Sequence, residues 1–382
     1  MATQERVRVG IIGGGLMGKE IAAAIARWPA LVDHPARPVL TAVCDIDPQV
    51  LAWFDRIDTV RTKVADYRDL LAEDSAGGGV DVVYIAVRHD LHERMYVDAV
   101  RAGKDLLAEK PFGIDLAAAE RIVAAIDAHP GVFVRCSSEM PFFPGAQAAI
   151  RRIADGALGE IIDASNAFGH SSDLDPGKPI NWKRQQQYCG AAGVMNDLGI
   201  HVLHTPLRLG WQPSLVYAVL QDLVPERPGP EGTPVVCDTF ENATLLCTVR
   251  QPGRSFPLTL ATKRIDPGQR NTWSLRVTGL GGGVEFSTRY PKTLRVMTLD
   301  GADQVWQEVE MGSQSVFPTV TGGIFETGFS DAILQMWAAF FAERAGLLGD
   351  GFGCVTPHEA VTSHRIWTAA LRSADSGAAV MP

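Results

Sequence analysis

The stretch Val7-Arg8-Val9-Gly10-Ile11-Ile12-Gly13-Gly14-Gly15-Leu16-Met17-Gly18 decides the fold of the N-terminal part of this chain. An apolar run of the kind that forms a strand leads into a glycine-rich turn, and a helical pattern follows at 19–28. In this G-x-G-x-x-G pattern Gly13 permits a tight turn, Gly15 lets the backbone approach a pyrophosphate, and Gly18 lets helix and strand pack closely. The helix N-terminus adds free N–H donors, so we predict a dinucleotide site that also includes Leu16 and Met17. A glycine turn without a ligand is the alternative, and the order strand, turn, helix argues against it.

The second predicted strand ends in Asp45, whose carboxylate can accept hydrogen bonds from both ribose hydroxyls and repel a 2′-phosphate. This favours NAD over NADP as the cofactor. The separation from the glycines is longer than the usual roughly 20 residues, which we attribute to a proline-containing insertion at 29–38. Asp47 is an alternative carboxylate, but its place before Pro48 favours a helix cap.

The fold class follows from how strand and helix patterns alternate along the chain. Strands are expected at 6–12, 39–45, 80–87, 105–109 and 132–137, with a short one near Lys63 and helices between them, which predicts a doubly wound parallel sheet of the Rossmann type. Beyond about residue 138 strands follow one another closely, which predicts an α+β domain with a large, mainly antiparallel open sheet.

The expected domains are therefore 1–137 for NAD binding and 138–382 for substrate binding and oligomerisation. In this scheme the closing helix at 357–374 is free to pack back near the first domain. The segment 225–234 reads as an exposed loop because it is rich in proline.

Composition narrows the function classes. The chain has 382 residues, 46% of them hydrophobic, and a formal net charge of -9, which disfavours nucleic acid as a partner because such binding needs clustered Lys and Arg. No apolar run approaches the roughly 20 residues of a membrane helix, and no export signal precedes the first strand. Six widely spaced cysteines without a C-x-x-C pair fit reduced thiols in a cytoplasmic protein.

Three further motifs extend the argument to most of the chain. They are Gly103-Lys104 leading to Glu109-Lys110-Pro111, the stretch Gly190-Ala191-Ala192-Gly193-Val194-Met195-Asn196-Asp197-Leu198-Gly199-Ile200-His201, and Thr356-Pro357-His358-Glu359-Ala360. Together with the glycine turn, this set resembles the Gfo/Idh/MocA oxidoreductase family. The resemblance implies an NAD-dependent dehydrogenase or reductase that moves a hydride to or from a hydroxyl-bearing carbon of a sugar, glycoside, cyclitol or related polyol. It also places Glu109 and His92 beside the cofactor.

The same resemblance identifies Lys110, Asp197 and His201 as catalytic residues. Lys110 ends a parallel strand, the edge at which open α/β sheets bind ligands, and its ammonium can stabilise developing alkoxide charge. Asp197 and His201 are four residues apart on one predicted helix, so a carboxylate could raise the pKa of the imidazole and orient it for proton transfer. Asp197, His201 and His204 could instead bind a metal. No H-E-x-x-H motif or cysteine set accompanies them, and the glycine motif already implies a hydride carrier, so we expect no metal.

Substrate contacts are harder to assign from the sequence. Trp182 and Lys183 resemble a segment that borders the substrate in the family, and Lys183 or Arg184 could donate hydrogen bonds to a sugar stacked on Trp182. Lys263 and Arg264 are weaker candidates. Two positions depart from the family pattern: Arg88 replaces a proline, and Glu139 stands where a neutral amide is usual.

Two other function classes remain open at this stage. One is a redox-neutral sugar-transforming enzyme that retains its NAD, and the other is a non-catalytic NAD-binding regulator with the same fold.

The oligomeric state is a separate expectation. A large open sheet like the one predicted for the second domain leaves one face without helices, so we expect a homodimer or homotetramer that buries this face.

Overall fold

The structure is a computed structural model that describes residues 5–72, 79–312 and 316–382. Its residues group into two compact units. The first comprises Met1–Glu139, Gln314–Gly322 and Gly328–Ala360, and the second comprises Met140–Ser313, Gly323–Thr327 and Val361–Pro382. The sequence-based division after residue 137 did not foresee that the chain returns to the first unit after residue 313.

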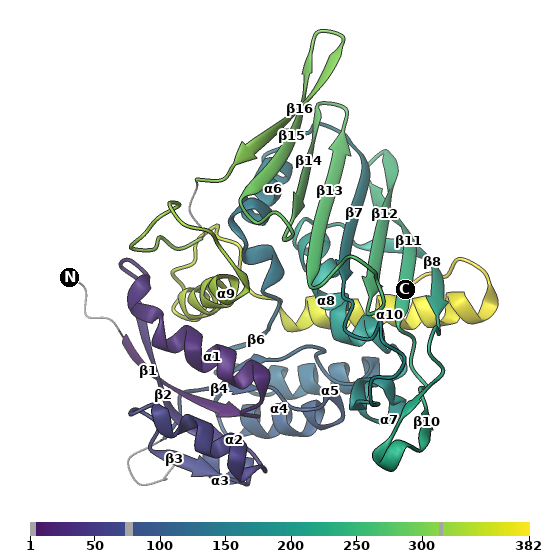
Figure 1. The fold of residues 1–382 in the computed structure, drawn as a ribbon. Helices are drawn as coiled ribbons and strands as arrows, with labels where there is room; N and C mark the ends of the chain where they lie inside the picture. The colour runs from purple at the N-terminus through teal and green to yellow at the C-terminus, as the bar shows by residue number, and fades with distance from the viewer. Residues whose placement is uncertain (1–4, 73–78, 313–315) are drawn as a thin grey trace. The chain divides into compact units, whose positions relative to one another are not determined.

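The first unit is built on a six-stranded parallel sheet with the strand order β3-β2-β1-β4-β5-β6 (Figure 1). Val9, Ile11, Val83 and Leu106 are among its fully buried side chains. This order is that of a doubly wound dinucleotide-binding fold and confirms the predicted Rossmann sheet. The strands are β1 Glu5–Ile12, β2 Ala36–Cys44, β3 Thr62–Val64, β4 Val82–Ile85, β5 Asp105–Ala108 and β6 Val134–Cys136.

Helices follow the strands of this sheet as the alternating pattern predicted. They are α1 Leu16–Ala26, α2 Pro48–Trp53, α3 Tyr67–Leu71, α4 His92–Arg101 and α5 Leu116–Asp127, with short 3₁₀ turns at Trp28–Ala30, Phe54–Arg56 and His89–Leu91. Asp47 caps α2, because its side chain accepts a hydrogen bond from the backbone N–H of Gln49 at 2.8 Å. The capping role expected for Asp47 is thereby confirmed.

The helix α9, Phe329–Arg344, also belongs to the first unit and packs on α1. Its residues from Ala332 to Ala342 are all buried, and Trp337 lies 5.8 Å from Tyr84 of β4 between ring centroids. Arg344 donates a hydrogen bond to Asp105 at 2.6 Å, which ties the end of α9 to the start of β5. A helix that is apolar on all sides needs cover on all sides, and the sheet and α1 provide it.

The second unit is built on an eight-stranded sheet with the order β16-β15-β14-β13-β7-β12-β11-β8 (Figure 1). Only β7 and β12 run parallel within this sheet; the other neighbours are antiparallel, which confirms the predicted large, mainly antiparallel sheet. The strands are β7 Ile161–Gly169, β8 Pro213–Gln221, β11 Asn242–Gln251, β12 Arg254–Lys263, β13 Thr272–Gly279, β14 Gly282–Ser287, β15 Thr293–Asp300 and β16 Asp303–Glu310. The sequence did not predict β16, because its side chains are exposed on both faces and show no alternation.

Helices cover one face of this second sheet. Among them, α6 packs on β14 and β15, and α8 packs on β7 and β12. On the other face, Tyr217, Val219 and Leu246 are exposed side by side, since Leu246 pairs in register with Tyr217. The helices of this unit are α6 Pro144–Ala154, α7 Gln186–Cys189, α8 Val194–Arg208 and most of α10 Pro357–Ser376, with 3₁₀ turns at Met140–Phe142, Trp182–Arg184 and Pro230–Gly232.

The expectation of an exposed loop at 225–234 was wrong in one respect. The segment forms a small hairpin of β9, Glu226–Pro228, and β10, Pro234–Val236. Within it Arg227 is buried, and its guanidinium donates hydrogen bonds to the carbonyl oxygens of Asp173 and Asp175. Proline content indicated the turn correctly but could not reveal the buried arginine. Within the described ranges, no helix is both long and apolar enough to cross a membrane.

Candidate active site

The candidate residues of the first unit lie at one edge of its sheet. Gly13 directly follows β1, Asp45 follows β2, and Glu109 and Lys110 follow β5. Because these strands are parallel neighbours in the order β2-β1-β4-β5, their carboxyl ends meet at the same edge. The chain reverses its direction of winding between β1 and β4, which is where open α/β sheets bind their ligands.

The glycine turn shows why each glycine is required. Gly13 has φ +94°, and a Cβ there would lie 2.3 Å from the carbonyl oxygen of Ala86. A Cβ on Gly18 would lie 2.4 Å from the carbonyl oxygen of Gly13, so helix and turn pack without room for a side chain. At Gly15, by contrast, no atom lies within 4 Å of the added Cβ. Packing thus explains Gly13 and Gly18, while Gly15 borders open space at the start of α1, as a phosphate cradle needs.

Asp45 faces this turn, because its Oδ2 accepts a hydrogen bond from the N–H of Gly14 at 2.8 Å. Its Oδ1 accepts from the N–H of Asp47 at 2.9 Å, so the carboxylate is fixed from both sides. Two apolar side chains stand in solvent at this edge, Ile46 with 88% exposure and Leu16 with 78%. Such side chains suit the flat faces of a bound nucleotide. Sequence reasoning missed Ile46, although an isolated isoleucine between two aspartates after a strand was a readable signal.

Glu109 is fixed at the end of β5 by hydrogen bonds. Its Oε1 accepts from the hydroxyl of Tyr84 at 2.6 Å and from that of Ser137 at 2.7 Å, while Oε2 accepts from the N–H of Lys110 at 3.2 Å. Burial and the nearby Glu109 charge raise the pKa of Tyr84, which therefore stays a hydrogen-bond donor. The side chain of Glu109 thus orders the strand end that carries Lys110.

A second buried carboxyl, Glu139, belongs to the same unit. Burial, and then the charge of Glu109, raise the pKa of Glu139 from 4.5 to about 7, against an opposing effect of Lys110. The residue that departs from the family pattern is therefore a group that exchanges its proton near neutral pH.

His92 connects the loops that follow β4 and β5. Its Nδ1 lies 2.8 Å from the carbonyl oxygen of Pro111, its Nε2 lies 3.0 Å from that of Val87, and its ring stacks on Tyr96. Burial lowers the pKa of His92, against an opposing effect of these two carbonyl groups. The structure gives His92 a role in shaping these loops, and its contact with a cofactor stays a prediction.

In the second unit, α8 carries Asp197 and His201, and its side chains from Val194 to Pro206 are all buried. The ring of His201 meets Phe168 of β7 edge-on at 5.2 Å, and its carbonyl oxygen accepts a hydrogen bond from Trp273 at 2.8 Å. His204 is buried beside Phe142. Across the described part of the chain, no three His, Cys, Asp or Glu side chains form a group that could hold a metal ion.

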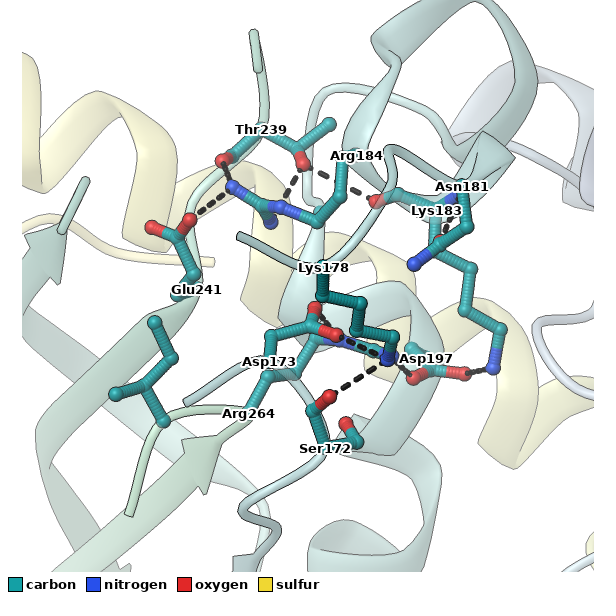
Figure 2. A network of polar contacts seen from close by, with 12 residues as sticks. Ser172, Asp173, Lys178, Asn181, Lys183, Arg184, Asp197, Thr239, Glu241 and Arg264 are labelled. Atoms are coloured by element: carbon teal, nitrogen blue, oxygen red, sulfur yellow. Dashed lines mark hydrogen bonds and ion pairs between the residues drawn. The ribbon is translucent and has the colours of Figure 1, made fainter. Parts of the chain in front are cut away.

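Asp197 lies in a network of alternating charges that the sequence did not reveal (Figure 2). Its Oδ1 accepts from Nζ of Lys183 at 2.7 Å, and its Oδ2 accepts from Nη1 of Arg264. Nε of Arg264 donates to Oδ2 of Asp173 at 2.9 Å, and Nζ of Lys178 donates to Oδ1 of Asp173 at 3.0 Å. The four residues that join Asp197 in this network come from three places in the chain: the loop after β7, the turn at Trp182–Arg184, and the end of β12.

The charges of this network reinforce one another. Burial alone would lower the pKa of Arg264, but the charges of Asp197 and Asp173 outweigh it and raise the pKa above its ordinary value. Burial would likewise raise the pKa of Asp173, but Arg264 and Lys178 lower it. Arg264, which the sequence placed among the weaker candidates, is thus a fixed cation beside Asp197.

The two basic side chains of the segment Trp182–Arg184 have different roles. Arg184 is fully buried and donates to Glu241 at 2.5 Å and to the carbonyl oxygen of Thr239 at 2.6 Å, which anchors the turn. Lys183 reaches Asp197 and lies over the ring of Trp182, with Nζ 5.5 Å from the ring centroid. Of the two basic candidates in this turn, Lys183 therefore joins the polar network, and Arg184 supports the fold.

Fold and edge residues together define a two-unit α/β protein with a dinucleotide-type glycine turn. Residues 7–135 match the family model described as an oxidoreductase family with an NAD-binding Rossmann fold, and residues 146–284 match the GFO/IDH/MocA C-terminal domain. The chain belongs to the GFO/IDH/MocA oxidoreductase family, as the sequence motifs indicated.

Curated relatives point in the same direction. Levoglucosan dehydrogenase of Pseudarthrobacter phenanthrenivorans is 29% identical over 235 residues, which are 60% of this chain and 57% of that protein. Inositol 2-dehydrogenase of Acidothermus cellulolyticus is 32% identical over 181 residues, which are 47% of this chain and 48% of that protein. The chain thus aligns with about half the length of these relatives.

Solved structures extend the likeness in fold over almost the whole chain. A structure of levoglucosan dehydrogenase in complex with NADH has a TM-score of 0.86 at 23% identity and covers 99% of both chains. An NAD-binding oxidoreductase from Klebsiella pneumoniae has a TM-score of 0.85 at 25% identity and covers 98% of this chain and 99% of the other.

Proposed function

We propose that this chain is an NAD-dependent dehydrogenase or reductase that acts on a hydroxyl-bearing carbon of a sugar, glycoside, cyclitol or related polyol. The observation that carries the proposal is the glycine turn at the carboxyl edge of the Rossmann sheet, with Gly15 open toward ligand and Asp45 beside Gly14. Relatives named for levoglucosan and inositol support the substrate class.

The residues at this edge fit a dinucleotide. The N–H groups at the start of α1 would hold the pyrophosphate, and the carboxylate of Asp45 would accept the ribose hydroxyls. Because a carboxylate repels a 2′-phosphate, NAD is preferred over NADP. NAD, when bound, supplies the acceptor or donor of a hydride, and the protein supplies binding, orientation and proton handling.

Lys110, Asp197 and His201 are the proposed catalytic residues. The ammonium of Lys110 binds the reacting hydroxyl and stabilises negative charge on its oxygen. His201 accepts the hydroxyl proton during oxidation and returns it during reduction. Asp197, held between Lys183 and Arg264, accepts a hydrogen bond from the substrate and orients it.

Trp182 and Lys183 are the proposed substrate contacts outside this set. Trp182 offers an aromatic face to a sugar ring, and Lys183 can donate to a hydroxyl oxygen from its place beside Asp197. An ammonium and a carboxylate side by side match two neighbouring hydroxyls of a polyol. One hydroxyl accepts a hydrogen bond from the ammonium, and the other donates one to the carboxylate.

The test is NADH formation from NAD with a panel of cyclitols, aldoses and glycosides. Gly15→Ala and Gly18→Ala serve as a matched pair in NAD titrations. Gly15→Ala adds a methyl in open space and should weaken NAD binding while the protein stays folded, whereas Gly18→Ala should cost about 1–3 kcal/mol of stability through overpacking. The proposal is contradicted if the protein turns over no member of the panel and Gly15→Ala binds NAD as tightly as wild type.

We further infer a homodimer or homotetramer formed through the open face of the second sheet. Tyr217, Val219 and Leu246 present a continuous apolar strip there, while their strand neighbours Val216 and Leu245 are buried toward the helices. Such a strip is usually covered by another subunit. All six cysteines are buried thiols, which supports a reducing compartment such as the cytoplasm.

A further inference from the structure

The charges around Asp197 differ strongly in their access to solvent. Exposure of the side chain is 0% for Asp173, 3% for Asp197 and 8% for Arg264, but 29% for Lys183 and 38% for Lys178. Three groups therefore form a buried row, and a more accessible lysine caps each end. Figure 2 shows Arg264 between the two carboxylates, with Lys183 on the far side of Asp197.

The backbone holds this row rigidly. Arg264 is the first residue after β12, and Asp173 lies shortly after β7, the parallel neighbour of β12. The N–H of Asp173 donates to the carbonyl oxygen of Arg264 at 3.3 Å, and the N–H of Arg264 donates to that of Glu241 at 2.9 Å. The backbone of Arg264 is thus fixed by the sheet, and its guanidinium is held by the two carboxylates.

Stability alone does not account for this arrangement. Buried ion pairs often contribute less than well-packed apolar side chains of the same volume, because both charges lose their hydration. The planar guanidinium offers donors in fixed directions, and here Nε serves Asp173 while Nη1 serves Asp197. A cation held in this way dictates the direction in which the Asp197 carboxylate points.

Building on the proposed function, we propose that Arg264, braced by Asp173, is the positioning residue that orients Asp197 for the polyol, and that Lys183 is the cation the polyol meets. In this arrangement Arg264 keeps Oδ2 of Asp197 occupied. Oδ1 faces the partly exposed Lys183, so a substrate hydroxyl approaches Asp197 from the Lys183 side. Arg264 acts through Asp197 and does not itself contact the substrate.

The expected effect is one of alignment. Small displacements of a group that orients a substrate cost up to about 100-fold in rate. Arg264→Gln should therefore lower kcat/KM for the polyol about 10- to 100-fold, through both a higher KM for the polyol and a lower kcat. The affinity for NAD should not change.

Two further variants grade the effect. Arg264→Lys keeps one charge but cannot reach both carboxylates as a fork, so its kcat/KM should lie between wild type and Arg264→Gln. Asp173→Asn removes the brace while Arg264 stays on Asp197, so its loss should be smaller, and it serves if Arg264→Gln fails to fold.

Arg184→Lys is the matched control. Arg184 is also a buried arginine in an ion pair of the same unit, but its partner is Glu241 rather than Asp197. Its replacement should lower the unfolding temperature and leave the Asp197 carboxylate in place, because Arg184 pairs with Glu241 and not with Asp197.

Crystal structures of Arg264→Gln and Arg184→Lys give a readout that needs no substrate. The Asp197 carboxylate should rotate in the first and stay in place in the second. An unmoved Asp197 in Arg264→Gln, or an unchanged KM for the polyol in that variant, overturns the inference. If the wild-type protein turns over no polyol, the proposed function fails, and the crystal structures alone decide whether Arg264 positions Asp197.

Discussion

Replacement of the buried Glu139 by glutamine tests the electrostatics of the first unit. Burial and the charge of Glu109 raise the pKa of Glu139 from 4.5 to about 7, so the folded protein holds this proton more tightly than the unfolded chain does. A group of this kind contributes stability that is fully present below the unfolded pKa and is lost as the pH rises through the folded pKa. The relevant window is therefore pH 4.5 to 7.

The size of the effect follows from the two pKa values. At 1.36 kcal/mol for each pH unit between them, ionised Glu139 costs the fold about 3 kcal/mol above pH 7. Glutamine has nearly the same shape and no charge to bury. We expect Glu139→Gln to gain about 3 kcal/mol in unfolding free energy over wild type as the pH rises from 4.5 to above 7.

The assay is urea unfolding of both proteins at several pH values across this window, followed by circular dichroism. Glu226→Gln is the control, since Glu226 is an exposed residue of β9 and its replacement removes a carboxyl group that the fold does not bury. A difference for Glu139→Gln that grows with pH no more than that for Glu226→Gln would falsify the reasoning, because folding would then leave the pKa of Glu139 unchanged.

Three other predictions follow from the proposed site. NAD should bind more tightly than NADP, and Asp45→Ser combined with Ile46→Arg should narrow or reverse the preference in titrations of both cofactors. Lys110→Ala and His201→Ala should each lower kcat about 10²- to 10⁴-fold without loss of NAD binding, and the double variant should lose less than the product; near-normal turnover in both single variants contradicts their assignment. Leu246→Lys should shift the protein toward monomer in light scattering, and a wild type that is already monomeric at micromolar concentration contradicts the proposed interface.

Local signals in the sequence were sufficient for most of the fold. The first sheet was predictable because each buried strand is followed by a helix within a short stretch, and the glycine turn marks where the first crossover begins. Asp47 was predictable as a cap because a cap depends on its immediate neighbours. The strand β16 was missed, since neither of its faces is buried and burial is the source of the alternating pattern.

The candidate site was less predictable because its contacts join distant parts of the chain. The spacing of Asp197 and His201 on one helix was readable, and it suggested that the carboxylate serves the imidazole. Arg264 follows 67 residues after Asp197, and no helical or strand period links the two. Only the parallel pairing of β7 and β12 brings Asp173 and Arg264 together, and side-chain partners set by sheet pairing are invisible to local patterns.

In both units, the charged residue that we propose for catalysis lies beside groups of the opposite formal charge. In the first unit, two carboxyl groups accompany the cation Lys110. Glu109 accepts a hydrogen bond from the backbone N–H of Lys110, and the charge of Lys110 lowers the pKa of Glu139. In the second, the anion Asp197 is held by the cations Lys183 and Arg264. Lys110 thus has the carboxylate of Glu109 beside it, and Asp197 has two cations beside it, so each of these charges is ordered within its own unit before a substrate binds. Groups ordered in advance need no rearrangement when charge develops on the reacting oxygen, and this is the condition under which fixed charges lower a barrier most.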